Sequence, residues 1–258
     1  MELNFKKFGG GFPLIILHGL MGSLDNWQGI AKKLASNFEV YTVDQRNHGK
    51  SPHSDDFNYQ LLADDLLQFF KQHNISKANI IGHSMGGKAA MLFALLHPEM
   101  VEKLIVVDVA PSQYEDGHSH VFKALMAAYV EHANTREEVQ EILNAKLNND
   151  IVTVGFLMKS LTRNENGTGF EWKFNLQSLM KNYDKISGPV GADKPFTGKA
   201  LFINGEKSNY INSSNYVDVV SLFPNHELAE VKGAGHWVHA DKPSEFLDAV
   251  LSFLNSTN

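Results

Sequence analysis

The 258-residue chain contains no cysteine. Its absence excludes disulfide bonds, metal sites built from thiolates and a cysteine nucleophile. The chain also has no run of 18 apolar residues, and its N-terminal stretch MELNFKKFGG lacks the apolar segment of a secretion signal. From these absences we predict a cytoplasmic protein without a membrane-spanning segment.

An excess of positive charge is missing as well. The formal net charge is −6, and the lysines and arginines are scattered along the chain. This distribution argues against nucleic acid or an anionic membrane as the main partner. Hydrophobic residues make up 43% and charged residues 20%, a balance typical of a globular protein with a sizeable core. The sequence does not indicate an oligomeric state.

Short apolar segments rich in β-branched residues alternate with longer segments of helical periodicity. The apolar segments 13–18, 38–44, 78–83 and 103–110 predict buried strands. The segments between them place apolar residues at i, i+3 and i+4, as amphipathic helices do. Because strands that alternate with helices form parallel sheets, we predict an α/β fold with a mostly parallel sheet flanked by helices.

This alternation stops at Pro111 and resumes at Phe196. We expect residues 1–110 and 196–258 to form the core domain and residues 111–195 to form an inserted cap made of helices only. Ligands of open α/β sheets bind outside the carboxyl ends of the strands, where such a cap would lie. The candidates for lining a substrate tunnel are apolar residues of the cap and one tryptophan of the core: Trp172, Phe174, Leu179, Met180 and Trp237.

The stretch NIIGHSMGGKA, residues 79–89, fits two different motifs. One is G-x-S-x-G, the sharp strand-to-helix turn that presents a nucleophilic serine. The other is the phosphate-binding loop G-x-x-x-x-G-K-[ST], whose last residue supplies a hydroxyl to magnesium. Ala89 occupies that last position and has no hydroxyl. We therefore interpret Ser84 as a nucleophile and Lys88 as an ordinary residue in the first turn of the following helix.

A nucleophilic serine needs a base and donors for the oxyanion. His236 follows a predicted strand and precedes the last helix, a position from which it can reach Ser84. His239, three residues later, is expected to support that loop. One oxyanion donor is expected from the N–H of the residue after the serine, Met85, and the other from the loop after an early strand. In the motif HGLMGS this second donor is the N–H of Leu20.

Four motifs that occur in order, HGLMGSLDNW, DQRNHGKS, GHSMGG and GAGHWVHADKP, resemble those of the α/β-hydrolase superfamily. Together with WKFN they are similar to the patterns of the YbfF-type esterase group. The resemblance covers nearly the whole chain outside the cap. It implies an α/β-hydrolase fold and esterase activity.

The acid that orients the histidine is less obvious. Superfamily members often carry it in the loop after the strand that follows the cap, where this chain has Ser208, and Glu206 lies too early in that loop. Asp108 ends the strand that follows the nucleophile's helix, and the resemblance to the YbfF-type group places the acid at this strand end. We predict Asp108 as the acid, with Glu206 as the alternative. The structural alternative is that Asp108 caps a helix or anchors a loop.

We therefore predict a serine hydrolase with Ser84, Asp108 and His236 that cleaves a small-molecule acyl ester or acyl-CoA-like thioester through an acyl-enzyme intermediate. This mechanism requires no metal and no organic cofactor. The alternatives are a C–C bond hydrolase or perhydrolase with the same triad, and a non-catalytic protein of this fold that binds a small molecule. Structural roles are expected for two polar motifs: the turn DQRNHGKS should fix the oxyanion loop, and His118 and His120 should begin a cap helix.

Overall fold

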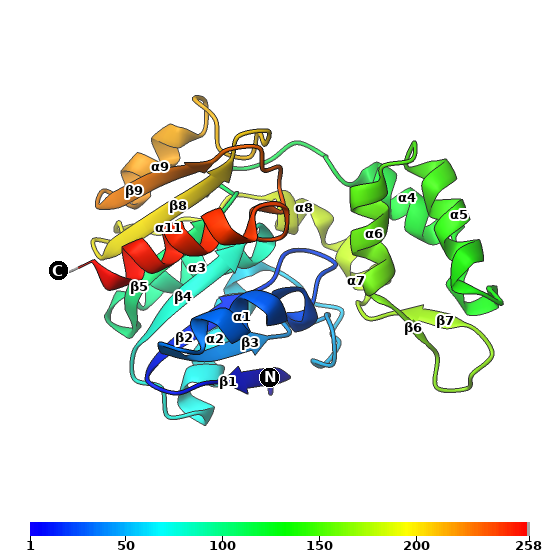
Figure 1. The fold of residues 1–258 in the computed structure, drawn as a ribbon, viewed down its shortest axis with the longest axis horizontal. Helices are drawn as coiled ribbons and strands as arrows, with labels where there is room; N and C mark the ends of the chain where they lie inside the picture. The colour runs from blue at the N-terminus through cyan, green and yellow to red at the C-terminus, as the bar shows by residue number, and fades with distance from the viewer. Residues whose placement is uncertain (257–258) are drawn as a thin grey trace.

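Seven strands form the central sheet of the protein, whose computed structural model describes residues 1–256 (Figure 1). Their order across the sheet is β1-β3-β2-β4-β5-β8-β9, with β1 antiparallel to β3 and the other neighbours parallel. The strands are β1 (Phe5–Phe8), β2 (Phe12–Leu17), β3 (Phe38–Val43), β4 (Ala78–His83), β5 (Val101–Val107), β8 (Lys199–Gly205) and β9 (His226–Val231). The predicted mostly parallel sheet is confirmed, and the antiparallel edge strand β1 is an addition that the apolar pattern did not reveal.

Helices cover both faces of this sheet. Leu104 and Val106 of β5 pack in one apolar cluster with α2, α3 and α9, whereas Ile105 and Val107 pack in another with α1 and α11. Burial on both faces explains why the central strands such as β4 and β5 are nearly continuous apolar runs in the sequence. The core helices are α1 (Gln28–Leu34), α2 (Tyr59–Gln72), α3 (Met85–Leu96), α9 (Tyr216–Leu222), α10 (Val238–Asp241) and α11 (Pro243–Asn255), with the 3₁₀ turns η1 (Leu24–Trp27) and η2 (Pro98–Met100).

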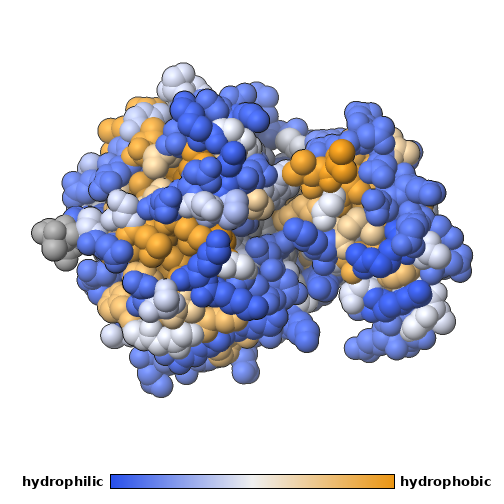
Figure 2. Space-filling view, in the orientation of Figure 1, coloured by the Kyte–Doolittle hydropathy of each residue, from blue (hydrophilic) through white to orange (hydrophobic). Residues whose placement is uncertain are grey.

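The chain between β5 and β8 contains the elements of the proposed cap, which stands beside one end of the sheet (Figure 1). These elements are α4 (Ser119–Ala127), η3 (Val130–His132), α5 (Arg136–Lys146), α6 (Ile151–Lys159), β6 (Leu161–Arg163), β7 (Phe170–Trp172), α7 (Leu176–Lys181) and α8 (Tyr183–Ser187). The space-filling view shows a hollow between core and cap (Figure 2). Residues 257–258 of the predicted core domain lie outside the described residues. No helix among the described residues is long and apolar enough to span a bilayer.

The cap is not purely helical, so the expectation of a cap made of helices only is wrong. β6 and β7 form an antiparallel hairpin in which Leu161 pairs with Trp172. The side chain of Asn164 accepts a hydrogen bond within the connecting turn, and Phe170 and Trp172 are buried while Glu171 is exposed. This alternation has the period of two that a strand requires, but three residues are too few to distinguish it from one helical turn in the sequence.

Candidate active site

Ser84 lies in the sharp turn between β4 and α3. Its backbone has φ 53° and ψ −120°, a conformation that is unfavourable for a residue with a side chain. A Cβ atom at Gly82 would lie 2.3 Å from the carbonyl oxygen of Gly86, and one at Gly86 would lie 2.5 Å from that of His18. The two glycines therefore permit a turn that projects the serine hydroxyl beyond the end of the sheet.

A chain of hydrogen bonds joins Ser84, His236 and Asp108. Nε2 of His236 lies 3.1 Å from Oγ of Ser84, and Nδ1 of His236 lies 2.7 Å from Oδ2 of Asp108. Asp108 follows β5 and is fully buried, whereas His236 lies in the loop between β9 and α10. Because a carboxylate only accepts, Nδ1 donates to it, and Nε2 is free to accept the serine proton.

Three donors converge on Asp108. Besides His236, the N–H of Gly205 donates to Oδ1 at 3.0 Å and the hydroxyl of Ser208 donates to Oδ2 at 2.5 Å. Ser208 occupies the loop position at which the sequence comparison expected an acid in many superfamily members, and here its hydroxyl donates to Asp108. Glu206 is exposed and accepts hydrogen bonds from the turn after β9. The structure thus brings Asp108, and not Glu206, into contact with His236.

Two aromatic neighbours fix the position of His236. The ring of Tyr210 stacks on the imidazole with centroids 4.1 Å apart and planes 21° apart. Nε2 of His83 lies 2.9 Å from the carbonyl oxygen of His236. Burial lowers the pKa of His83 well below its usual value of 6.5, so its neutral ring donates this hydrogen bond. His239 supports the same loop by stacking on Trp27 at 3.9 Å.

Two backbone N–H groups beside Ser84 are available to a ligand. Leu20 and Met85 both line the main cavity next to the serine. Met85 is the first residue of α3, so its N–H has no acceptor within the helix. Neither N–H donates a hydrogen bond within the part of the chain that the structure describes.

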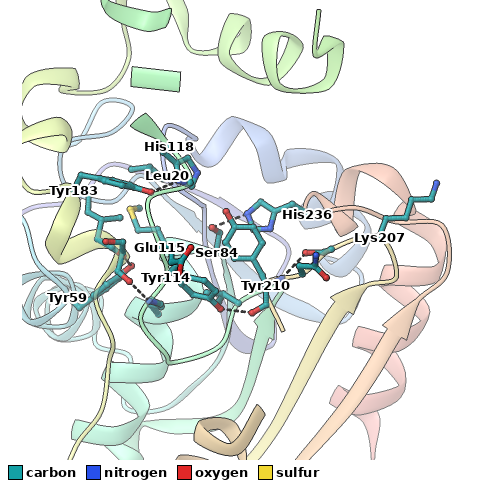
Figure 3. A pocket seen from close by; sticks show the side chains of 18 residues that line it. Leu20, Tyr59, Ser84, Tyr114, Glu115, His118, Tyr183, Lys207, Tyr210 and His236 are labelled. Atoms are coloured by element: carbon teal, nitrogen blue, oxygen red, sulfur yellow. Dashed lines mark hydrogen bonds between the residues drawn. The ribbon is translucent and has the colours of Figure 1, made fainter. Parts of the chain in front are cut away.

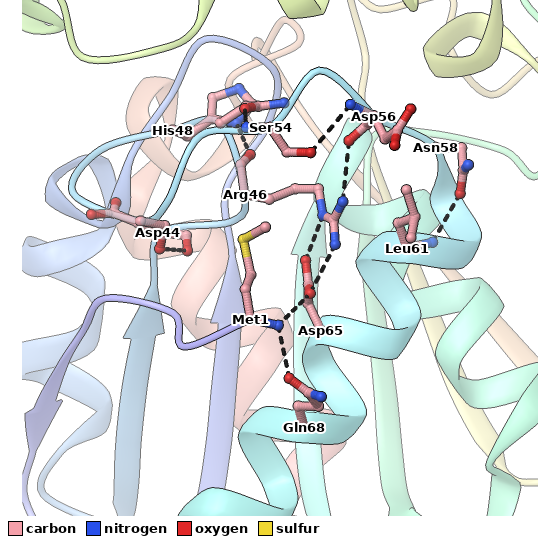
Figure 4. A network of polar contacts seen from close by, with 12 residues as sticks. Met1, Asp44, Arg46, His48, Ser54, Asp56, Asn58, Leu61, Asp65 and Gln68 are labelled. Atoms are coloured by element: carbon pink, nitrogen blue, oxygen red, sulfur yellow. Dashed lines mark hydrogen bonds and ion pairs between the residues drawn. The ribbon is translucent and has the colours of Figure 1, made fainter.

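The polar turn of residues 44–51, of which Asp44, Arg46 and His48 are drawn in Figure 4, holds the loop that carries Leu20. Nε2 of His48 accepts the N–H of Met21 at 3.1 Å, and the carboxylate of Asp44 accepts an N–H at the start of η1 at 2.7 Å. Arg46 is held by a carboxylate of α2, with the nearest atoms 2.6 Å apart. These contacts confirm that the turn supports the loop after β2.

The main cavity beside Ser84 and His236 has a volume of about 560 Å³ (Figure 3). Its walls include four tyrosines: Tyr59, Tyr114, Tyr183 and Tyr210. His118 also lines it and lies just before α4, as expected, with Nδ1 2.8 Å from a tyrosine hydroxyl of α8. A second cavity of about 190 Å³ shares Ser84 and His236 and is lined by Phe156 and Trp237. Ser84 therefore lines two cavities, one larger and one smaller.

A family model described as alpha/beta hydrolase fold matches residues 13–149. The chain belongs to the α/β-hydrolase family. This α/β hydrolase is 38% identical to esterase YbfF of Escherichia coli, over 94% of this chain and 93% of the relative. It is also 38% identical to the sn-1-specific diacylglycerol lipase ABHD11 of Mus musculus, over 98% of this chain and 85% of the relative. A solved marine microorganism esterase superposes with a TM-score of 0.95 at 43% identity, covering 98% of this chain and 99% of that one.

These comparisons confirm the resemblance to YbfF-type esterases. The α/β hydrolase is an enzyme of the esterase and lipase type. Of these three names, only that of the lipase specifies an ester. The substrate of this hydrolase therefore has to be inferred from the geometry of its own site.

In this hydrolase, four cap residues that were predicted to line a substrate tunnel do not lie around Ser84. They are Trp172, Phe174, Leu179 and Met180. None of them lines either cavity beside the serine. Trp172 and Phe174 stack with centroids 5.5 Å apart, and Phe174 forms a β-bridge with His48. The unexpected hairpin thus directs these rings toward the core turn, whereas Trp237 of the core does line the smaller cavity.

Sequence reasoning also missed Lys88 of this hydrolase. It is not an ordinary helix residue, because only 1% of it is exposed and it lines the main cavity. The signal was a single charge in the otherwise apolar helix MGGKAAMLFALL. Charged residues are rarely fully buried without partners, so a lysine at this buried position indicates specific contacts for its ammonium.

Proposed function

We propose that the protein is a serine hydrolase that cleaves carboxylic esters or acyl thioesters. Ser84 is the nucleophile, His236 the general base, and Asp108 the residue that orients the base. The observation that carries this proposal is the continuous chain of hydrogen bonds, 3.1 Å from Ser84 to His236 and 2.7 Å from His236 to Asp108. A nucleophile, a base and an orienting group in such contact are the parts that acyl transfer requires.

The reaction proceeds in two halves. Oγ of Ser84 attacks the acyl carbon while Nε2 of His236 takes the hydroxyl proton, and Asp108 stabilises the resulting imidazolium. His236 then gives this proton to the leaving alcohol or thiol, which leaves the acyl group on the serine. A water molecule, deprotonated by the same nitrogen, attacks the acyl-enzyme, and the acid and free Ser84 are released.

The N–H groups of Leu20 and Met85 stabilise the tetrahedral oxyanion. Support comes from their position beside Ser84 and from the lack of any other acceptor for either N–H within residues 1–256. One such donor is typically worth about 10²–10³ in kcat, so this pair supplies a large part of the rate enhancement.

The substrate is a small-molecule ester or thioester whose acyl group occupies the cavity of about 560 Å³. This volume lies within the range of ligand cavities, roughly 300–1,000 Å³. The relatives named esterase YbfF and sn-1-specific diacylglycerol lipase agree with an ester as the reacting group. A thioester presents the same acyl carbon to the serine, so an acyl-CoA-like compound is included in the proposal.

Substitution Ser84→Ala tests the proposal. We expect hydrolysis of p-nitrophenyl butyrate to fall by at least about 10³-fold, because the nucleophile is lost while the oxyanion donors remain. A fluorophosphonate should label the wild-type protein at Ser84 and leave the variant unlabelled, and circular dichroism should show an unchanged fold. Retained activity in the folded variant, or labelling at another residue, would refute the assignment. A wild-type protein that takes no label would instead indicate a non-catalytic binder.

A further inference from the structure

Lys88 is a buried cation that the proposed reaction does not use. It lies in the first turn of α3, and its N–H bonds to the carbonyl oxygen of Ser84 at 3.1 Å. Its Nζ donates to the carbonyl oxygens of Ser112 at 2.7 Å, Gly188 at 2.6 Å and Ser187 at 3.3 Å. An ammonium has three N–H donors and no acceptor. All three donors of Lys88 are thus used by backbone oxygens, so it is not a free cation for a substrate.

These carbonyls belong to the two segments by which the chain enters and leaves the cap. We name residues 110–114 the first crossing and residues 186–190 the second crossing. The crossings also bond to each other, because the N–H of Tyr114 donates to Ser187 at 2.9 Å and that of Val190 donates to Pro111 at 2.8 Å. One side chain of the nucleophile's helix therefore binds both crossings where they run side by side.

The crossings form part of the wall of the main cavity. Tyr114, Ile186 and Ser187 line it. Nζ of Lys88 lies 4.6 Å from the ring centroid of Tyr114 and 5.7 Å from that of Tyr59, within the range of cation–π attraction. The hydroxyl of Tyr59 donates to the carbonyl oxygen of Ile186 at 2.6 Å. In Figure 3, Tyr59 lies across the cavity from His236, so Lys88 holds the wall opposite the base.

Holding a charge at this position is unfavourable in itself. Burial lowers the pKa of Lys88 to about 7, since no carboxylate bonds to its Nζ among the described residues. An apolar side chain would fill the same volume without this cost, but it could not bind carbonyls of two separate segments. The ammonium is therefore suited to fixing the crossings rather than to filling space.

We propose that Lys88 is a positioning residue that sets acyl-chain specificity by fixing both crossings of the cap relative to Ser84. Lys88 lies one helical turn after Ser84, so the spacing between the nucleophile and the far wall of the cavity depends on this contact. The specificity part rests on the proposed function, which assigns the acyl group to this cavity. The clamp itself is a statement about structure and is testable without any substrate.

Lys103 offers a matched control. It is also a buried lysine, and its Nζ donates to three carbonyl oxygens at the end of α11, at 3.0, 3.0 and 2.7 Å. It lines none of the cavities near Ser84. The variants Lys88→Met and Lys103→Met thus both remove hydrogen bonds from a buried ammonium to backbone carbonyls, but only Lys88→Met removes bonds to the cap crossings.

The first measurement compares p-nitrophenyl acetate with p-nitrophenyl decanoate. For Lys88→Met we expect KM for the decanoate to rise about tenfold relative to that for the acetate, with kcat for the acetate within about threefold of wild type. Lys103→Met should leave the KM ratio unchanged. A proportional change for both esters, or an equal change in both variants, would overturn the specificity role. If Lys88→Met does not fold, Lys88→Gln, which keeps two N–H donors, should change the ratio in the same direction.

The second measurement needs no activity. Hydrogen exchange of the N–H groups of Tyr114 and Val190 should accelerate at least about tenfold in Lys88→Met and not in Lys103→Met, because these groups bond across the crossings. Unchanged exchange would overturn the clamp. If wild-type protein hydrolyses neither esters nor thioesters, the proposed function fails, and the exchange result still decides whether Lys88 holds the crossings.

Discussion

At the scale of single residues, Asp108 carries the sharpest test of the site. It accepts hydrogen bonds from His236, Gly205 and Ser208. An asparagine there would turn its NH2 group, which can only donate, toward groups that also donate. We expect Asp108→Asn to lower kcat for p-nitrophenyl butyrate by about 10³–10⁴-fold, because the imidazole loses its orienting acceptor. The control Glu206→Gln should stay within about twofold of wild type, since this side chain is exposed and surface ion pairs contribute little. The reverse pattern would make Glu206 the acid.

The role of a residue was predictable from the sequence where it depends on residues that lie close to it along the chain. The turn around Ser84 needs glycines two positions away on either side, and both are visible in GHSMG. Lys88 differs, because its carbonyl partners lie 24 and 100 residues along the chain. Every residue type has a backbone carbonyl oxygen, so no sequence motif could reveal this contact.

At the scale of elements, the turn of residues 44–51 has a consequence for the rate. His48 is buried and accepts the N–H of Met21, next to the proposed donor Leu20. We expect His48→Leu to lower kcat about tenfold with little change in KM, because the oxyanion loop loses an anchor. The exposed His53 provides the control, and His53→Leu should leave kcat unchanged. If His48→Leu lowers only the melting temperature, the turn supports the fold and not the reaction.

The cap shows where prediction of elements reached its limit. The strands β2, β3, β4 and β5 are mostly buried apolar segments, and segments of helical periodicity separate them, so their type was clear from the sequence. The hairpin strands have three residues each, and their pairing depends on the turn between them. Trp172 and Phe174 were predicted to line the pocket because they are apolar residues of the cap. The ring of Phe174 instead packs toward His48, and Trp172 stacks on Phe174, which the apolar pattern of the sequence does not reveal.

At the scale of the whole molecule, the architecture followed from alternation alone, because strands buried on both faces require helices on both sides. The proximity of the candidate residues Ser84 and Asp108 followed as well, since parallel strands place their carboxyl ends at one edge. Ser84 follows β4 and Asp108 follows β5, and these strands are neighbours in the sheet. The position of the cap relative to this edge depends instead on contacts such as those of Lys88, which only the three-dimensional structure contains.

Buried histidines make the whole fold sensitive to acid. Burial lowers the pKa of the buried His239 to about 3 and that of the half-buried His118 to about 4, against 6.5 in the unfolded chain. Above pH 6.5 these histidines are neutral in both the folded and the unfolded chain, so they do not lower the free energy of unfolding. As the pH falls below 6.5, the unfolded chain binds protons that the folded chain cannot, and stability is lost. Between pH 7.5 and 5.5 each such histidine should lower the free energy of unfolding by about 1.4 kcal/mol.

Urea unfolding at these two pH values measures the loss. His239 is fully buried against Trp27, and its Nδ1 has no hydrogen-bond partner among the described residues. Replacing it with phenylalanine keeps an aromatic ring in that position and removes the titrating group. We therefore expect His239→Phe to lose about 1.4 kcal/mol less than wild type between pH 7.5 and 5.5. If both proteins lose the same free energy of unfolding, His239 takes up a proton without unfolding, and its burial is not the source of the acid sensitivity.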